Sequence, residues 1–272
     1  MKTLYISDLD GTLLNSQAEL SEYTIKTLNH LIKNGVHFSI ATARTAATTL
    51  LMFENVVLNI PIILMNGVLV YDPDSKEYIK KETLSGTIAA NIIHAMRKAK
   101  QTGLMYTLRG DEMLTYYETL DNEALRDFIN ERKTKYNKVF TQISDFSDVK
   151  DDIIYFCFLD NQENIERTYS LIAGINGIEI AKYRDIYSDN LWYLEVFSAA
   201  ASKYNAVRFL REYGNYERII GFGDNLNDVP LFRACDECYA VANAKNELKD
   251  IATAVIESND NNGVVKWLEE NV

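Results

Sequence analysis

The feature that most constrains this sequence is a short apolar segment, residues 4–6, that leads into two aspartates one residue apart, Asp8 and Asp10. If residues 3–7 form a buried strand, both aspartates leave its carboxyl end, where open α/β sheets place their ligand crevices. Two carboxylates this close repel each other and resist desolvation, so they stay ionised only beside a cation or a net of hydrogen bonds. The segment therefore predicts a metal site, with an aspartate-rich turn as the alternative.

Composition limits the classes of protein that this chain can belong to. Its 272 residues, 47% of them hydrophobic, can bury one sizeable core, or a core and a smaller second one. The net charge of -11 disfavours nucleic acid and anionic membrane surfaces as partners, although a small phosphorylated molecule can still bind where positive charge is local. Met1 leads straight into the first strand and no apolar run approaches a membrane span, so we expect a cytoplasmic protein.

Cysteine and histidine do not form a recognisable metal or redox site. The cysteines are three, Cys157, Cys235 and Cys238, and the last two make a C-x-x-C without a second pair or a nearby histidine. The three histidines are scattered along the chain. We therefore interpret the cysteines as reduced thiols of the core rather than as a redox or zinc site.

The first eighty residues alternate between strand and helix patterns. Ser21 is placed to cap a helix that Gly35 would end, and apolar strands follow at residues 36–41 and 62–65. This β-α-β-α-β order predicts a parallel sheet with right-handed crossovers. Polar residues follow three of the strands, namely Asp8, Thr42 and Asn66, so all three could point into one crevice.

The pattern changes near residue 81. Further helices and three or four strands follow, at residues 88–96, 104–108, 114–117, 125–129, 153–159, 162–172 and 178–183. About a hundred residues of this kind can fold as a separate α/β unit. We expect one unit at residues 1–82 and 192–272, with a second, α/β unit inserted at residues 83–191.

The last eighty residues return to the first pattern. After an extended segment at 191–197, Ser202 is placed to cap a helix with Lys203 in its first turn. A strand at 218–222 then leads into a turn that carries Asp224 and Asp228. A lysine in the first turn is unfavourable to the helix dipole, so its presence suggests that it binds an anion there. The alternative is a solvated surface lysine without a ligand.

The residues at these strand ends suggest phosphoryl transfer. Four carboxylates and one lysine would give the crevice a charge of about -3, so a phosphate would not bind there without a divalent cation. Mg²⁺ prefers oxygen ligands of this kind. Asp8 could then attack phosphorus while Asp10 moves the proton, with Thr42 and Lys203 holding phosphate oxygens. Taken alone, Thr42 could instead be a helix cap.

At this point the sequence resembles a known family over nearly its whole length. Its segments ISDLDGTLL, IATART and GFGDNLNDVPLF, together with the lysine of SAAASKYNAV, resemble the four motifs of the haloacid dehalogenase superfamily. MNGVLV and YAVANA resemble segments of the Cof-type sugar-phosphate phosphatases within it. The resemblance implies an α/β fold with a Rossmann-like parallel sheet core. The catalytic core would be residues 1–82 and 192–272, and an α/β cap at residues 83–191, inserted after the third strand, would decide the substrate.

The resemblance also implies a role for each matching residue. It makes Asp8 the nucleophile, Asp10 the acid/base, and Asp224 a metal ligand beside the Asp8 side chain and the Asp10 backbone carbonyl. The remaining implied residues are Thr42, Lys203 and Asn227 on the phosphate, Asp228 in support of the metal through water or a hydrogen bond, and Arg44 and Asn66 at the substrate end. Glycines that the family usually has are replaced by Ala43, Ala200 and Tyr204.

The sequence therefore predicts a Mg²⁺-dependent phosphatase for a small phosphorylated metabolite, a sugar phosphate first of all, acting through an aspartyl-phosphate as a monomer or weak homodimer. Two alternatives are a phosphosugar mutase, which would transfer phosphate to a second sugar, and a non-catalytic sensor of phosphometabolites. Four cap residues are candidates for substrate contact and equally for packing or an exposed surface position: Arg109, Tyr183, Arg184 and Trp192.

Overall fold

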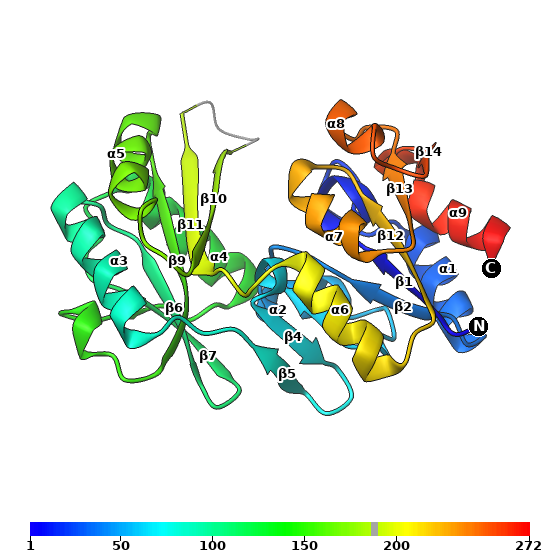
Figure 1. The fold of residues 1–272 in the computed structure, drawn as a ribbon, viewed down its shortest axis with the longest axis horizontal. Helices are drawn as coiled ribbons and strands as arrows, with labels where there is room; N and C mark the ends of the chain where they lie inside the picture. Colours follow the sequence, from blue (N-terminus) through cyan, green and yellow to red (C-terminus); the bar gives the residue numbers. More distant parts are fainter. Residues whose placement is uncertain (186–189) are drawn as a thin grey trace. The chain divides into compact units, whose positions relative to one another are not determined.

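The protein is described here from a computed structural model that covers residues 1–185 and 190–272. The chain folds into two compact units (Figure 1). Residues Met1–Lys80 and Ala201–Val272 form the first, called the core unit, and Lys81–Ala200 form the second, called the inserted unit. The chain thus leaves the core unit once and returns to it once.

A parallel sheet of five strands lies at the centre of the core unit, in the order β14-β13-β12-β1-β2. Strand β1 lies between β12 and β2 and is buried on both faces, with Leu4 and Ile6 on one face and Tyr5 on the other, which is why the segment reads as a continuous apolar run. The α/β class and the parallel core are therefore as predicted. The strands are β1 (Thr3–Ser7), β2 (His37–Ile40), β12 (Arg218–Gly223), β13 (Glu237–Val241) and β14 (Ala254–Ile256).

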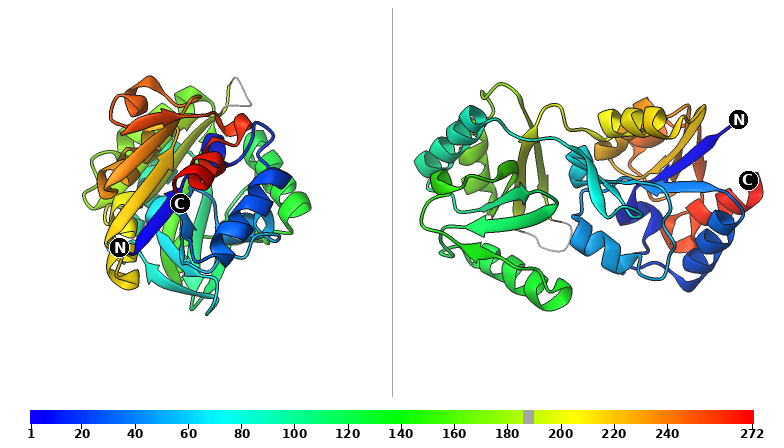
Figure 2. Two further views of the ribbon diagram at one scale, coloured as in Figure 1. Left: turned by 90° about the vertical axis from the view of Figure 1, so that its right-hand side faces the viewer. Right: turned by 90° about the horizontal axis from the view of Figure 1, so that it is seen from below.

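Helices cover both faces of this sheet. In Figure 2, α1 and α9 lie together on one face, and α6 and α7 lie on the other. Serine side chains cap two of them as predicted: Ser21 Oγ accepts from the Thr24 amide, and Ser202 Oγ from the Asn205 amide. The helices of this unit are α1 (Glu22–Lys33), α2 (Ala46–Met52), α6 (Lys203–Gly214), α7 (Val229–Ala234), α8 (Asn246–Lys249) and α9 (Gly263–Asn271).

The third strand, β3 (Ile62–Leu64), meets the parallel sheet through one bridge between Ala41 and Ile63. It also begins a small sheet with β4 (Leu69–Asp72) and β5 (Glu77–Lys81), two strands that the sequence pattern does not predict. Both are short and follow a turn at Met65–Gly67 in which all three residues have positive φ. Neither segment alternates apolar and polar residues, so the period of two that indicates a half-buried strand is absent from both.

The inserted unit is built on a second, six-stranded sheet in the order β10-β11-β9-β6-β7-β8. Helices α3 and α5 pack together over a core on one face that includes Phe156, Phe158 and Leu194. Side chains alternate along strands, so Tyr193 points to the opposite face, where its ring lies 6.3 Å from that of Phe128 on α4. The elements are α3 (Gly86–Ala99), β6 (Leu104–Arg109), β7 (Glu112–Tyr117), α4 (Glu123–Tyr136), β8 (Thr141–Gln142), β9 (Asp152–Asp160), α5 (Gln162–Ile172), β10 (Ile178–Arg184) and β11 (Trp192–Ser198).

Strand β11 corrects one predicted boundary. The sequence places residues 192–200 in the catalytic core, but Trp192–Ser198 pair along their length with β9 and β10 of the inserted unit. This also raises the number of strands there above the expected three or four. An apolar strand carries no local sign of the sheet it joins, because its partners are distant in sequence.

The structure also describes the state of the cysteines and the length of the apolar helices. All three cysteines are free thiols, with Cys157 and Cys238 buried and Cys235 partly buried. Within residues 1–185 and 190–272, no helix combines the length and apolar composition needed to cross a bilayer.

Candidate active site

The two aspartates of the first motif leave β1 in different environments. The Asp8 amide donates to the Phe222 carbonyl of β12 at 3.0 Å, and its side chain is buried, whereas the Asp10 side chain is 49% exposed. Gly11 follows with φ of +78°, and a Cβ there would lie 2.5 Å from Asp224 Oδ2. Only glycine permits this turn and this close approach, so it brings the first motif against the fourth.

Lys203 joins the two halves of the core unit. Its Nζ donates to Asp8 Oδ1 at 2.6 Å and to Asp228 Oδ1 at 2.7 Å, and its side chain is 1% exposed. Ser202 sets this position, because its cap starts α6 at Lys203, beside the end of the sheet. The lysine is therefore a buried partner of carboxylates and not a solvated surface residue.

The turn after β12 holds the other two aspartates. Asp228 is fully buried, and its Oδ2 accepts from the amides of Asp224 and Asn225 at 3.0 and 3.2 Å. The Asp224 carboxylate accepts from Thr12 Oγ1 at 3.0 Å. Sequence reasoning missed this role of Thr12, although the residue belongs to the first motif and its position in the DxDGT pattern was the available signal.

Crowding of like charges dominates the electrostatics. Burial, followed by Asp228, raises the pKa of Asp8, and Lys203 opposes the effect. Burial and Asp228 likewise raise the pKa of Asp224 to about 7, against Thr12 and Lys203. Burial alone would lower the pKa of Lys203, but Asp228 and Asp8 outweigh it and raise that pKa. The group thus has more negative charge than its lysine can balance.

The residues fit a divalent cation. Carboxylate oxygens of Asp8, Asp224 and Asp228 all lie within 4.8 Å of one another. Oxygen donors of this kind suit Mg²⁺ better than softer metals, and a cation would relieve the repulsion that raises the pKa values of Asp8 and Asp224. Asp228 has both oxygens engaged by nitrogen donors, so Asp8 and Asp224 are better placed to face a cation directly.

Thr42, Arg44 and Asn66 lie together at the neighbouring strand end. Thr42 is buried, and its Oγ1 accepts from the Arg44 amide at 3.1 Å, while its carbonyl accepts from the Asn66 amide at 3.0 Å. The Arg44 guanidinium donates to both oxygens of Asp10, at 2.6 and 2.8 Å. The buried Asn66 Oδ1 has no hydrogen-bond partner within the described part of the chain, which leaves it open to a donor.

Some predicted residues are not tied to this group. Asn227 is exposed, and its side chain makes no hydrogen bond to any described residue. The three residues that replace family glycines all have negative φ, so Ala43, Ala200 and Tyr204 occupy backbone conformations open to any L-residue. Their side chains therefore impose no backbone strain.

The candidate residues of the inserted unit have structural partners of their own. Arg109 donates to both oxygens of Asp151, at 3.0 and 3.1 Å. Tyr183 stacks on Tyr193 with ring centres 5.2 Å apart, and Trp192 packs against the core below α3 and α5. Arg184 ends β10. These contacts explain the first three residues as packing or ion pairing, without assigning them a substrate.

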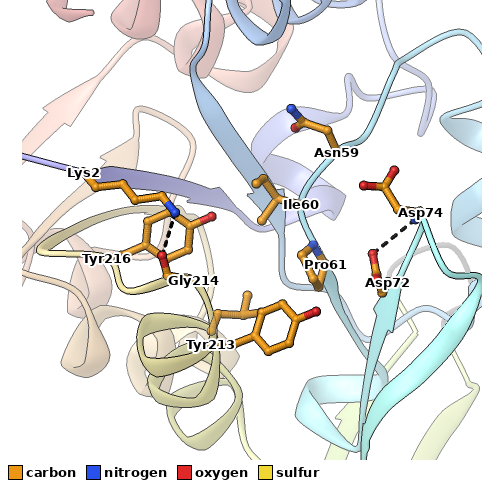
Figure 3. Close-up of a pocket in the computed structure, with 10 residues that line it drawn as sticks. Lys2, Asn59, Ile60, Pro61, Asp72, Asp74, Tyr213, Gly214 and Tyr216 are labelled. Atoms are coloured by element: carbon orange, nitrogen blue, oxygen red, sulfur yellow. Dashed lines mark hydrogen bonds between the residues drawn. The ribbon is translucent and has the colours of Figure 1, made fainter.

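A separate hollow of about 210 Å³ lies elsewhere in the core unit (Figure 3). Lys2, Pro61, Asp74, Tyr213 and Tyr216 are among the residues around it. Lys2 precedes β1, whereas Asp8 follows that strand, so the hollow lies near the amino end of β1 and the aspartates lie at its carboxyl end. None of the predicted site residues lines it.

Comparison with known proteins identifies relatives over nearly the full chain. A family model described as haloacid dehalogenase-like hydrolase matches residues 5–268. The phosphatase YwpJ of Bacillus subtilis is 27% identical, with 99% of each chain covered. The pyridoxal phosphate phosphatase YbhA of Escherichia coli is 21% identical, with 96% of this chain and 95% of the relative covered. A solved structure from Thermotoga maritima is 25% identical, with a TM-score of 0.83 over 100% of this chain and 98% of that one.

Proposed function

The chain belongs to the haloacid dehalogenase-like hydrolase family, and on that premise we propose that it is a Mg²⁺-dependent phosphatase of small phosphorylated metabolites, with a sugar phosphate as the first candidate. The reaction would pass through an aspartyl-phosphate on Asp8. The chain would work in the cytoplasm, as a monomer or weak homodimer.

One observation carries this proposal. A single buried lysine is bonded to Asp8 and Asp228, and the carboxylates of Asp8, Asp224 and Asp228 lie within 4.8 Å of one another. A purely structural ion pair would not need a third carboxylate, since removing charge from water is costly. A site that takes a cation and then a phosphate has a use for all of them.

Asp8 would be the nucleophile. Its carboxylate oxygen forms a bond to phosphorus while the bond from phosphorus to the leaving oxygen breaks, and Asp10 gives that oxygen a proton. Asp10 then takes a proton from the water that hydrolyses the aspartyl-phosphate, so it ends the cycle as it began. Lys203 would offset the charge on the phosphoryl oxygens, together with Thr42.

The cation would be held by Asp8, Asp224 and the Asp10 carbonyl, with Asp228 in support. When bound, Mg²⁺ neutralises charge between the carboxylates and the phosphate. Without Mg²⁺, the four aspartates of the site together with Lys203 and Arg44 carry a charge of about -2, which would repel a phosphate dianion.

Arg44, Asn66 and Asn227 are the candidates for the substrate end in the core unit, and we propose that the inserted unit decides which substrate is accepted. Relatives are named for phosphatase activity on 5-amino-6-(5-phospho-D-ribitylamino)uracil and on pyridoxal phosphate. These compounds belong in the substrate panel beside the sugar phosphates.

The test is release of inorganic phosphate from that panel in the presence of Mg²⁺, ranked by kcat/KM. We expect EDTA to abolish the activity and added Mg²⁺ to restore it. We expect Asp8→Asn to abolish turnover while circular dichroism stays unchanged, because Lys203 keeps its bond to Asp228. Phosphate release that survives both EDTA and Asp8→Asn would contradict the mechanism, and transfer to a second sugar would indicate a mutase instead.

A further inference from the structure

The side chain of Asp10 has an unusual environment for an acid/base. It is 49% exposed, and within residues 1–185 and 190–272 the only donors to its carboxylate are the two from Arg44. Asp8 and Asp228, by comparison, are buried and held by Lys203. A half-exposed carboxylate without partners would sample several rotamers, so Arg44 is what fixes this one.

Arg44 is itself well anchored. Its amide donates to Thr42 Oγ1 at 3.1 Å, and its carbonyl accepts from the Met65 amide at 3.1 Å. Its backbone is thus tied to the ends of two strands, and its side chain is only 21% exposed. The guanidinium is planar and offers two parallel N–H donors, a geometry that fixes both the position and the plane of a carboxylate.

We propose that Arg44 is a positioning residue that acts through Asp10, holding the carboxylate in the orientation from which it exchanges protons with the leaving oxygen and with water. This inference rests on the proposed phosphatase function. Arg44 keeps its own protons throughout, and Asp10 loses one and regains one in each cycle, so the proton balance of the reaction is unchanged. A role through Asp10 differs from a direct bond between Arg44 and the substrate.

A double-mutant cycle separates the two roles. The proteins are the wild type, Arg44→Gln, Asp10→Ala and the double variant, assayed with p-nitrophenyl phosphate and Mg²⁺. The phenolate leaves without needing a proton, so the residual activity of the Asp10→Ala variants stays measurable, and the rate reports the attack of water. We expect Arg44→Gln to lower kcat by up to about 100-fold with little change in KM.

The decisive comparison is in the Asp10→Ala background. If Arg44 acts through Asp10, adding Arg44→Gln to Asp10→Ala lowers kcat no further. Arg44→Lys should recover part of the kcat lost in Arg44→Gln, because lysine has the positive charge but not the two parallel N–H donors of the guanidinium. Arg233→Gln is the matched control, since Arg233 is exposed on α7 and has no hydrogen bond or ion pair to a described residue. It should behave as wild type.

Two results would overturn the inference. In an active enzyme, losses that multiply in the double variant would show that Arg44 acts independently of Asp10. An increase in KM at constant kcat for Arg44→Gln would assign it to substrate binding. A wild-type protein that releases no phosphate from any compound contradicts the proposed function itself, and the inference with it.

Discussion

Lys203 shows how a residue can be unfavourable by local rules and required by its surroundings. A cation at the first position of a helix opposes the helix dipole by about 0.3–1 kcal/mol, and its burial is a further cost. Asp8 and Asp228 repay both, each with a bond of 2.7 Å or less. The lysine in turn permits the two carboxylates to be buried side by side.

We predict that Lys203→Met lowers the free energy of unfolding of the core unit by about 3–5 kcal/mol, because two buried carboxylates lose their counter-charge. It should also abolish phosphate release. Lys26→Met is the control, since Lys26 pairs with Glu22 on the exposed face of α1 at 3.1 Å and such pairs are worth at most about 1 kcal/mol. Denaturant unfolding followed by Trp267 fluorescence, in a Trp192→Phe background, measures the core unit. Equal losses in the two variants would contradict this reading.

At the scale of elements, the start of α6 is held by a turn that lies more than a hundred residues earlier. A Cβ at Gly67 would lie 2.2 Å from the Ser202 carbonyl oxygen, and Gly67 has φ of +98°. The turn at Met65–Gly67 therefore fixes the position of the backbone at Ser202 and Lys203. Small displacements there would be passed directly to the buried lysine.

We predict that Gly67→Ala destabilises the core unit by more than the cost of a left-handed backbone and also lowers kcat, because the Ser202 carbonyl must move. Gly35→Ala is a matched control: its φ is +92°, but nothing lies within 4 Å of the added Cβ. That variant should lose only the backbone cost, about 1–2 kcal/mol, with kcat unchanged. The same fluorescence assay and phosphate release decide the matter. If the two variants lose equal stability and activity, the contact with Ser202 has no role.

These elements also show what the sequence could and could not predict. Asp8, Ser202 and Lys203 follow from local patterns, because strand ends, helix caps and an unusual lysine can each be recognised within a few residues. The contacts of Thr12 with Asp224 and of Arg44 with Asp10 join residues 212 and 34 positions apart. Nothing local marks such pairs, which depend on how strands order in the sheet. The same holds for β11, whose partners decide its unit.

On the scale of the whole molecule, the inserted unit contains a buried ionisable side chain that the proposed reaction does not use. Glu195 on β11 is 8% exposed, and its Oε2 has no hydrogen-bond partner in the described part of the chain. Burial raises its pKa from 4.5 to about 7, although Tyr155 and Tyr183 oppose the effect. Between pH 4.5 and about 7, Glu195 is therefore protonated in the folded inserted unit but ionised in the unfolded chain.

The stability of the inserted unit should consequently fall as the pH rises from 4.5 to about 7, by up to about 3 kcal/mol, since the folded state binds more protons than the unfolded state over that range. We predict that Glu195→Gln flattens this dependence and is more stable than wild type at pH 8. Glu179→Gln, on the neighbouring strand and exposed, should leave the slope unchanged. Trp192 fluorescence in a Trp267→Phe background follows this unit through denaturant unfolding at each pH. Parallel curves for Glu195→Gln and wild type would mean that Glu195 is ionised in the folded protein at pH 5, and that the tyrosines or a water stabilise its charge.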